Sequence, residues 1–299
     1  MNLRDFEYII AVADEEHFGR ASDKCNVSQP ALSGQIKKLE QTLGVKIFER
    51  TNRRVSVTPV GREIVEKARR LLTMADEIRD TAAAASDPLA GHIRLGTIPT
   101  IGPYLLPSIL RPIKSALPKL DISLAEDVTQ SLERRLVLGD IDAAITATVP
   151  GVPGVESIDL YTEPFLAAFP EGHALGSRKE LAIDDLDSAE LLLLRDGHCL
   201  SDQVAELCGL ARGQIVALDT QASSLETIIG LVAAGTGITL LPSLAVSQGG
   251  GVRSKLAIRP INDKHAARAI RLVFRESYPK RELINMIADV IKKSAQELL

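Results

Sequence analysis

The sequence predicts an α/β effector domain of two lobes, preceded by an all-α winged helix-turn-helix and a long linker helix. Three observations support this prediction. Apolar residues recur at helical spacing over residues 1–58, which end in a short hairpin pattern. Residues 59–87 carry a heptad-like repeat. From residue 91 to residue 299, short apolar runs alternate with helical stretches, as is typical of α/β folds.

Composition and charge narrow the class of protein. The 299 residues are 45% hydrophobic and 25% charged, which is ordinary for a globular protein. No apolar run is long enough for a membrane span and the N-terminus does not read as a signal peptide, so we expect a cytoplasmic protein without a membrane partner. In a reducing cytoplasm, the cysteines Cys25, Cys199 and Cys208 are not expected to form a structural disulfide framework.

The charge is distributed unevenly along the chain. Residues 20–70 hold twelve Lys or Arg against five Asp or Glu, whereas the whole chain has a net charge of −4. A basic segment on an acidic body is typical of a protein that binds a polyanion such as DNA. A solvated charged face would give the same composition, so the charge alone does not decide between the two.

The N-terminal 58 residues contain the pattern of a helix-turn-helix with a wing. Two helices joined by a tight turn near Asn26 are expected between residues 18 and 43, where Ser28 is a candidate N-cap and Gly44 ends the second helix. β-branched residues on either side of residues 51–54 predict a hairpin. The second helix and the wing offer side chains suited to base edges and phosphates. These candidates are Ser28, Gln29, Pro30, Ser33, Gln35, Lys37 and Lys38 on the helix, and Arg50, Arg53 and Arg54 on the wing.

The linker helix is expected over residues 59–87. Its apolar residues follow a 4-3-4-3-4 spacing, which is a heptad seam suited to pairing with a second chain. The seam consists of Ile64, Ala68, Leu71, Ala75, Ile78 and Ala82. Packing of this helix against its own domain is the competing interpretation.

The effector domain is predicted over residues 91–299. Eight apolar runs are candidate strands, and helical stretches at residues 128–138, 225–234 and 280–298 lie between them. This alternation predicts mostly parallel sheets in two lobes with a cleft between them, with lobe I at about residues 91–162 and 268–299 and lobe II at about residues 163–267. The eight runs are HIRLGTI, DISLAE, AAITAT, FLAAF, ELLLL, QIVAL, GITLL and IRLVF.

The segment RDGHCLSDQVAELCGL, residues 195–210, places two cysteines nine residues apart. If the segment is helical, the helical rise separates their Cα atoms by about 13 Å, whereas a disulfide requires less than about 7 Å. Oxidation of Cys199 to sulfenic acid and attack by Cys208 would therefore require the segment to refold. A reactive Cys199 is expected to have a depressed pKa. Two small buried hydrophobic residues are the alternative interpretation.

The segments VSQPALSGQIKKLEQTLG, FERT and TPVG, read between Ala21 and Gly61, resemble the LysR-type transcription regulators. The resemblance covers the whole chain and implies the same three-part architecture. TIPTIGPYLLP, the HC…C pair and SLETIIGLVAAGTGITLLPSLAV are similar to the hydrogen-peroxide-sensing members of that family. They imply that peroxide oxidises Cys199, that Cys208 resolves it, and that the changed effector domain alters the DNA-bound oligomer and the transcription of antioxidant genes. The implied partners are double-stranded promoter DNA, hydrogen peroxide, RNA polymerase and further copies of the chain in a tetramer, a dimer of dimers.

The same resemblance implies a set of residues around the thiol. The residues implied to bind peroxide are Thr100, Thr129, His198, Gln203 and Arg268. Arg271 lies three residues from Arg268 and complicates that assignment, and each threonine could instead be an ordinary helix cap. Cys25 is interpreted as core packing, and no zinc or dinucleotide motif is present, so neither a metal nor a cofactor is expected. Two other functions stay open: a LysR-type regulator that senses a small metabolite anion, and an enzyme of the thiol peroxidase class, although the DNA-binding module argues against an enzyme.

Overall fold

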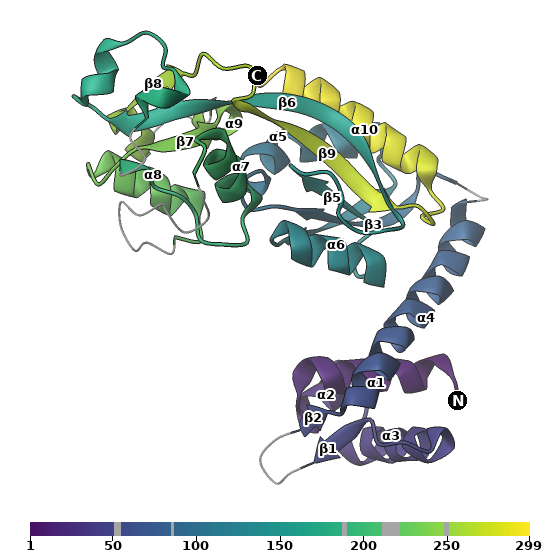
Figure 1. The fold of residues 1–299 in the computed structure, drawn as a ribbon. Helices are drawn as coiled ribbons and strands as arrows, with labels where there is room; N and C mark the ends of the chain where they lie inside the picture. The colour runs from purple at the N-terminus through teal and green to yellow at the C-terminus, as the bar shows by residue number, and fades with distance from the viewer. Residues whose placement is uncertain (51–54, 85–86, 187–189, 211–221, 248–250) are drawn as a thin grey trace. The chain divides into compact units, whose positions relative to one another are not determined.

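A computed structural model describes the chain except for residues 51–54, 85–86, 187–189, 211–221 and 248–250 (Figure 1). The chain divides into two compact units. One comprises Met1–Ala82 with Val137–Asp140, and the other comprises Ala83–Leu136 with Ile141–Leu299.

The N-terminal head consists of three helices and a two-stranded wing. The helices are α1 (Leu3–Glu15), α2 (Phe18–Lys24) and α3 (Gln29–Leu43), and the wing pairs β1 (Phe48–Arg50) with β2 (Val55–Val57) in antiparallel fashion. Asn26 adopts a left-handed φ of 54° in the turn before α3, and Gly44 ends α3 with a φ of 69°. Ser28 occupies the N-cap position of α3, as expected, but its side chain makes no capping hydrogen bond.

A buried carboxylate joins the wing to α3. Glu40 accepts hydrogen bonds from the backbone N–H groups of Ile47, at 2.9 Å, and Phe48, at 3.1 Å. Burial raises the pKa of Glu40, but these hydrogen bonds and the nearby Lys46 outweigh it and leave the pKa below its ordinary value. The carboxylate is therefore ionised at neutral pH and fixes the start of the wing on the helix.

The linker helix α4 extends over Pro59–Ala84. Its first part belongs to the head, because Val65 and Ala68 are buried in the head's hydrophobic core and Ile64 packs against it. The later part of the heptad seam is open, since Leu71 is 39% exposed and Ile78 is 68% exposed. The packing of α4 on its own domain thus accounts for the beginning of the seam but not for its end.

The effector unit is built on one curled mixed sheet. The strands are β3 (Gly91–Thr97), β4 (Leu120–Glu126), β5 (Ala143–Thr146), β6 (Val155–Pro170), β7 (Thr239–Pro242), β8 (Leu256–Pro260) and β9 (Ala267–Arg275). Their order is β4-β3-β5-β9-β6-β7, and β8 also pairs with β6. The long strand β6 belongs to both lobes: its first ten residues pair with β9, and the residues from Phe165 onward pair with β7 and β8 (Figure 1).

The prediction of mostly parallel sheets is wrong. Within the described residues, β3 is parallel to β4 and β5, whereas β9, β6, β7 and β8 pair in antiparallel fashion. The cause is the crossover between lobes, because the chain leaves lobe I on β6 and returns on β9, and the two strands run in opposite directions side by side. The run ELLLL does not form a strand either and contributes only the bridge Leu191–Ile238, while QIVAL lies outside the described residues.

Six helices pack around this sheet in the described part of the chain. They are α5 (Gly102–Ala116), α6 (Thr129–Leu138), α7 (Cys199–Leu207), α8 (Leu225–Ala233), α9 (Ser243–Ser247) and α10 (Arg281–Gln296), with short 3₁₀ turns at Ala174–Ser177, Ile183–Asp185 and Gly251–Lys255. The helical stretches expected before β5, before β7 and at the C-terminus are confirmed as α6, α8 and α10. None of the described helices combines the length and the hydropathy that crossing a membrane requires.

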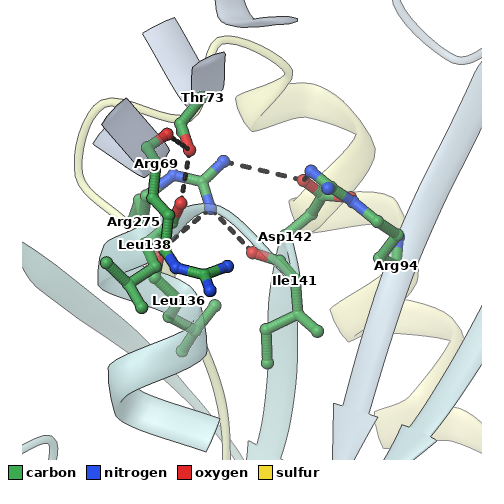
Figure 2. Close-up of polar contacts among 8 residues, drawn as sticks. All are labelled: Arg69, Thr73, Arg94, Leu136, Leu138, Ile141, Asp142 and Arg275. Carbon is green, nitrogen blue, oxygen red and sulfur yellow. Dashed lines mark hydrogen bonds and ion pairs between the residues drawn. The ribbon is translucent and has the colours of Figure 1, made fainter. Parts of the chain in front are cut away.

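A buried ion cluster connects α6 to the sheet (Figure 2). The Asp142 carboxylate accepts one hydrogen bond from the backbone N–H of Arg94 and one from the Nη2 group of Arg94, each at 2.7 Å. It also forms an ion pair with Arg275 at 3.6 Å. Arg275 in turn donates to the carbonyl oxygens of Leu136, at 3.0 Å, and Ile141, at 2.7 Å. One guanidinium thus ties the last turn of α6 to the segment just before β5, which fixes the position of the helix that carries Thr129.

Candidate functional site

Cys199 is the first residue of α7 and lies at a small cavity of the effector unit. The cavity lies between the loop after β3, the start of α6 and the start of α7, and it is too narrow for a water-sized sphere. Its lining consists of Ile98, Pro99, Thr100, Val128, Thr129, Gly197, His198 and Cys199. The structure therefore brings together four residues singled out from the sequence: the thiol, the two threonines and His198.

Arg268 reaches this cavity through Thr100. Its NH1 group donates to the Thr100 hydroxyl at 2.9 Å, and its NH2 group donates to the Thr100 carbonyl at 3.0 Å. Arg271 lies on the opposite face of β9, because side chains alternate along a strand, and it forms an ion pair with the exposed Asp159 at 2.8 Å. Of the two arginines, Arg268 is the one at the thiol.

The pKa of Cys199 is raised above its ordinary value in this conformation. Burial is the largest cause and raises the pKa, as does Asp202 to a smaller extent; the Arg268 charge, the Thr129 hydroxyl and the Leu200 N–H lower it. The expectation of a depressed pKa is therefore wrong for this structure. The thiol is mostly protonated at neutral pH, and only the fraction that loses its proton is nucleophilic.

Two of the residues that line this cavity carry a buried polar atom without a well-formed hydrogen bond. The Thr129 hydroxyl and His198 Nε2 make no hydrogen bond of ordinary geometry within the described residues. Burial, followed by the charge of Arg195, lowers the pKa of His198, so its imidazole is neutral at physiological pH. Because buried polar groups are nearly always satisfied, these two atoms are candidates to bind a small polar ligand, although the cavity must widen beyond its size in this conformation to admit one.

Gln203 lies one turn further along α7 and does not line this cavity. Its Nε2 group donates to the Ala147 carbonyl at 2.8 Å, while its Oε1 atom is buried without a partner among the described residues. The sequence predicted Gln203 beside the thiol. The structure places it on the same helix as Cys199 but not in the lining of the thiol cavity. Its observed contact is between α7 and the loop that follows β5.

Cys208 caps the C-terminal end of α7, and burial raises the pKa of its thiol. Both Cys199 and Cys208 are free thiols. The intervening residues are helical, so a rise of 1.5 Å per residue places the two Cα atoms roughly 13 Å apart. A disulfide between them is geometrically excluded while α7 remains a helix.

A second, wider hollow of about 320 Å³ adjoins the thiol cavity and shares Pro99, Val128 and His198 with it. Its lining includes three carboxylates, those of Glu126, Asp127 and Glu226, and one guanidinium, that of Arg195. This charge balance does not suit a small carboxylate ligand. Among the described residues, no group of three His, Cys, Asp or Glu is placed to hold a metal ion.

The candidate DNA-binding residues of α3 form an accessible face. Ser28, Gln29, Pro30, Gln35, Lys37 and Lys38 are exposed, and Ser33 is half-buried. The wing residues Arg53 and Arg54 and the side chain of Arg50 lie outside the described part of the structure. Cys25 caps α2 and packs partly buried against the core of the head, which agrees with its interpretation as a packing residue.

One residue at the site was not singled out by the sequence. Glu163, on β6, is fully buried and accepts hydrogen bonds from Arg268, through Nε, at 2.9 Å. Its position directly opposite Arg268 in the β6–β9 register could be recognised only once the two strands were known to pair.

Known proteins resemble this chain over nearly its whole length. The family models that match are the "Bacterial regulatory helix-turn-helix protein, lysR family", at residues 3–62, and the "LysR substrate binding domain", at residues 86–296. The "Hydrogen peroxide-inducible genes activator" of Dickeya chrysanthemi is 42% identical, covering 99% of this chain and 96% of that protein. The "DNA-binding transcriptional dual regulator OxyR" of Escherichia coli K12 is 40% identical, covering 98% and 95%.

Solved structures agree with these sequence matches. Full-length OxyR from Pseudomonas aeruginosa, in a cysteine-to-aspartate variant, aligns with a TM-score of 0.79 and 37% identity and covers 98% of each chain. A cysteine-to-serine variant of OxyR from Corynebacterium glutamicum with bound H2O2 aligns with a TM-score of 0.66 and 36% identity, covering 99% of this chain and 93% of that one. The chain therefore belongs to the LysR family of bacterial helix-turn-helix regulators and, within it, to the OxyR group.

Proposed function

We propose that this chain is a cytoplasmic, DNA-binding transcription regulator that senses hydrogen peroxide through Cys199 and Cys208. The observation that carries the proposal is the small cavity at Cys199, which Thr100, Thr129 and His198 also line. Arg268 donates a hydrogen bond to the Thr100 hydroxyl of this cavity. Hydrogen peroxide is small and neutral, and each of its oxygens both donates and accepts hydrogen bonds. The relatives named as peroxide-inducible activators support the same conclusion.

The chemistry proceeds in two displacement steps. The Cys199 thiolate attacks one peroxide oxygen, the O–O bond breaks, and the leaving hydroxide takes up a proton to form water, which leaves Cys199 as sulfenic acid. Cys208 then attacks the sulfenic sulfur, a disulfide forms, and a second water leaves. Thr100, Thr129 and His198 orient the peroxide, and the positive charge of Arg268 stabilises the thiolate.

The second step requires α7 to unfold, because its helical form holds the cysteines too far apart. The refolded segment changes the surface of the effector domain and, through it, the DNA-bound oligomer and its contact with RNA polymerase. The chain carries a DNA-binding helix-turn-helix, so the output of this oxidation is a changed DNA complex and the protein acts as a switch and not as an enzyme. The carboxylate-rich hollow beside the site disfavours the metabolite-anion alternative.

The direct test is to treat the reduced protein with one equivalent of peroxide and to map its disulfides by mass spectrometry, with a DNA footprint before and after. A Cys199–Cys208 link and an altered footprint are expected. If Cys199 and Cys208 both stay reduced at saturating peroxide, the proposal is wrong, and a regulator that senses another ligand is favoured.

DNA contact through α3 predicts two distinguishable variants. Lys37→Ala should weaken binding to all DNA sequences alike and reduce the slope of log affinity against log salt by about one, because one phosphate contact is lost. Gln29→Ala should instead relax base preference by about 1–3 kcal/mol at one position. Fluorescence anisotropy across a salt series measures both, and an unchanged salt slope for Lys37→Ala would remove this face of α3 from the DNA interface.

If the linker helices of two chains pair, a charged substitution at Leu71 should reduce the size of the oligomer. The side chain is 39% exposed on the open part of the seam, as expected for a residue covered by a second chain. Leu71→Glu places a charge in that contact and should yield smaller oligomers than the tetramer we expect for the unmodified chain. Light scattering reads the mass, and Glu77→Gln on the same helix serves as the control; an unaltered mass for Leu71→Glu contradicts the assigned seam.

A further inference from the structure

We propose that Glu163 is a positioning residue for the peroxide reaction, which fixes the Arg268 guanidinium against Thr100 and, by neutralising its charge, sets how readily Cys199 loses its proton. The inference rests on the proposed function, since it takes Cys199 as the reacting thiol. It concerns a residue that lies outside the cavity and acts only through Arg268.

The geometry of the carboxylate supports a positioning role. Glu163 and Arg268 are direct partners in the antiparallel pairing of β6 and β9, which brings their side chains within reach of each other. One carboxylate oxygen lies 2.9 Å from Nε and 2.7 Å from NH2 of Arg268. The other oxygen accepts a hydrogen bond from the Leu244 N–H at 3.1 Å, at the start of α9.

The remaining donors of Arg268 are consequently aimed at Thr100. A guanidinium is planar and rigid, so engaging the Nε edge with a carboxylate determines where NH1 points. NH1 and NH2 donate to the Thr100 hydroxyl and carbonyl. The chain of contacts therefore runs from α9, through Glu163 and Arg268, to the threonine that lines the thiol cavity.

The ion pair is buried on both sides, with side-chain exposures of 1% for Arg268 and 0% for Glu163. Charges in such an environment interact more strongly than at the surface. The charged groups that act on Cys199 are Arg268, on β9, and Asp202, on α7, while His198 is neutral. Glu163 itself pairs with Arg268, and its charge is, after burial, the next cause that raises the pKa of Tyr161. Among these groups, Arg268 is the cation that stabilises the thiolate. Its ion pair with Glu163 therefore weakens that stabilisation.

Removal of the carboxylate charge should make the thiol more acidic. In Glu163→Gln, Arg268 keeps a neutral acceptor but loses its counter-ion, so its charge acts on the thiolate uncompensated. The midpoint of Cys199 alkylation against pH should then fall by roughly one unit, since a nearby opposite charge lowers a pKa by about 1–3 units. Below the midpoint, alkylation should be about tenfold faster than in the unmodified protein. The full-length protein is treated with iodoacetamide, and the Cys199 peptide is quantified by mass spectrometry.

Two further variants separate positioning from a purely structural effect. Glu163→Asp keeps the charge and should restore the midpoint of the unmodified protein. Glu156→Gln, on the same strand but exposed and paired with Arg281, should leave it unchanged. A lower melting temperature of Glu163→Gln with an unshifted midpoint would overturn the proposal.

A double variant keeps the test decisive if Glu163→Gln does not fold. Glu163 contacts Arg268 and acts on the thiol only through it, so Arg268→Gln and Glu163→Gln/Arg268→Gln should share one midpoint. A difference between these two profiles would show that Glu163 acts on the thiol without Arg268 and would contradict the proposal. Alkylation requires no peroxide, so a failure of peroxide sensing would not be mistaken for a failure of this inference.

Discussion

Exchange of Cys199 for serine is expected to leave a protein that binds DNA and no longer responds to peroxide. A serine hydroxyl at the start of α7 preserves the size and hydrogen bonding of the residue but has no thiolate to attack the O–O bond. The head and its α3 face are a separate unit and keep their structure. The footprint of Cys199→Ser should therefore be identical before and after peroxide, and its mass should not change.

Two control variants locate the effect within the site. Cys208→Ser should still gain one oxygen at Cys199, trapped by a sulfenic-acid reagent, but should form no disulfide and show no change of footprint. Cys25→Ser should respond like the unmodified protein, because Cys25 packs in the head. A peroxide-dependent footprint in Cys199→Ser would mean that another group is the sensor.

The elements that sequence predicted well are those whose signals are local. The third helix was expected to begin after Ser28 and end at Gly44, and it extends over Gln29–Leu43. Capping residues and helical periodicity act within one or two turns, so they can be interpreted without knowing the fold. The helices α6, α8 and α10 also lie within one or two residues of the stretches that the sequence predicted to be helical.

The sheet was predicted less well because strand partners are chosen by tertiary structure. The first ten residues of β6, VESIDLYTEP, mix polar and apolar side chains and gave no apolar run, although all but Leu160, at a bulge, pair with β9. The apolar run ELLLL, in contrast, is buried without a strand partner beyond one bridge. Burial on two sides produces an apolar run whether or not the backbone pairs.

The site shows the same division. The residues Cys199, Thr100, Thr129 and His198 were found by motif, and the structure gathers them around one cavity. The direction of the Cys199 pKa and the part played by Glu163 were not predictable, because they depend on burial and on strand register. Desolvation of a thiol by side chains distant in sequence leaves no local signal.

Exchange of Asp142 for alanine is expected to produce the largest loss of stability in the effector domain. Asp142 is buried, and it compensates Arg94 and the buried Arg275 (Figure 2). Removing one partner of a buried pair leaves an uncompensated charge, which lowers the free energy of unfolding by about 3–5 kcal/mol. Denaturant unfolding of the full chain is followed by far-ultraviolet circular dichroism. The unfolding midpoint of the effector domain should move to a lower denaturant concentration.

The matched control for this loss is Asp159→Ala. Asp159 pairs with Arg271 at 2.8 Å but is 77% exposed, so water already compensates its charge and the loss should be below about 1 kcal/mol. Because Arg275 holds the end of α6 at Leu136, Asp142→Ala should also loosen the helix that begins at Thr129 and slow the oxidation of Cys199. Equal losses of stability in Asp142→Ala and Asp159→Ala would show that the buried cluster contributes no more than a surface ion pair.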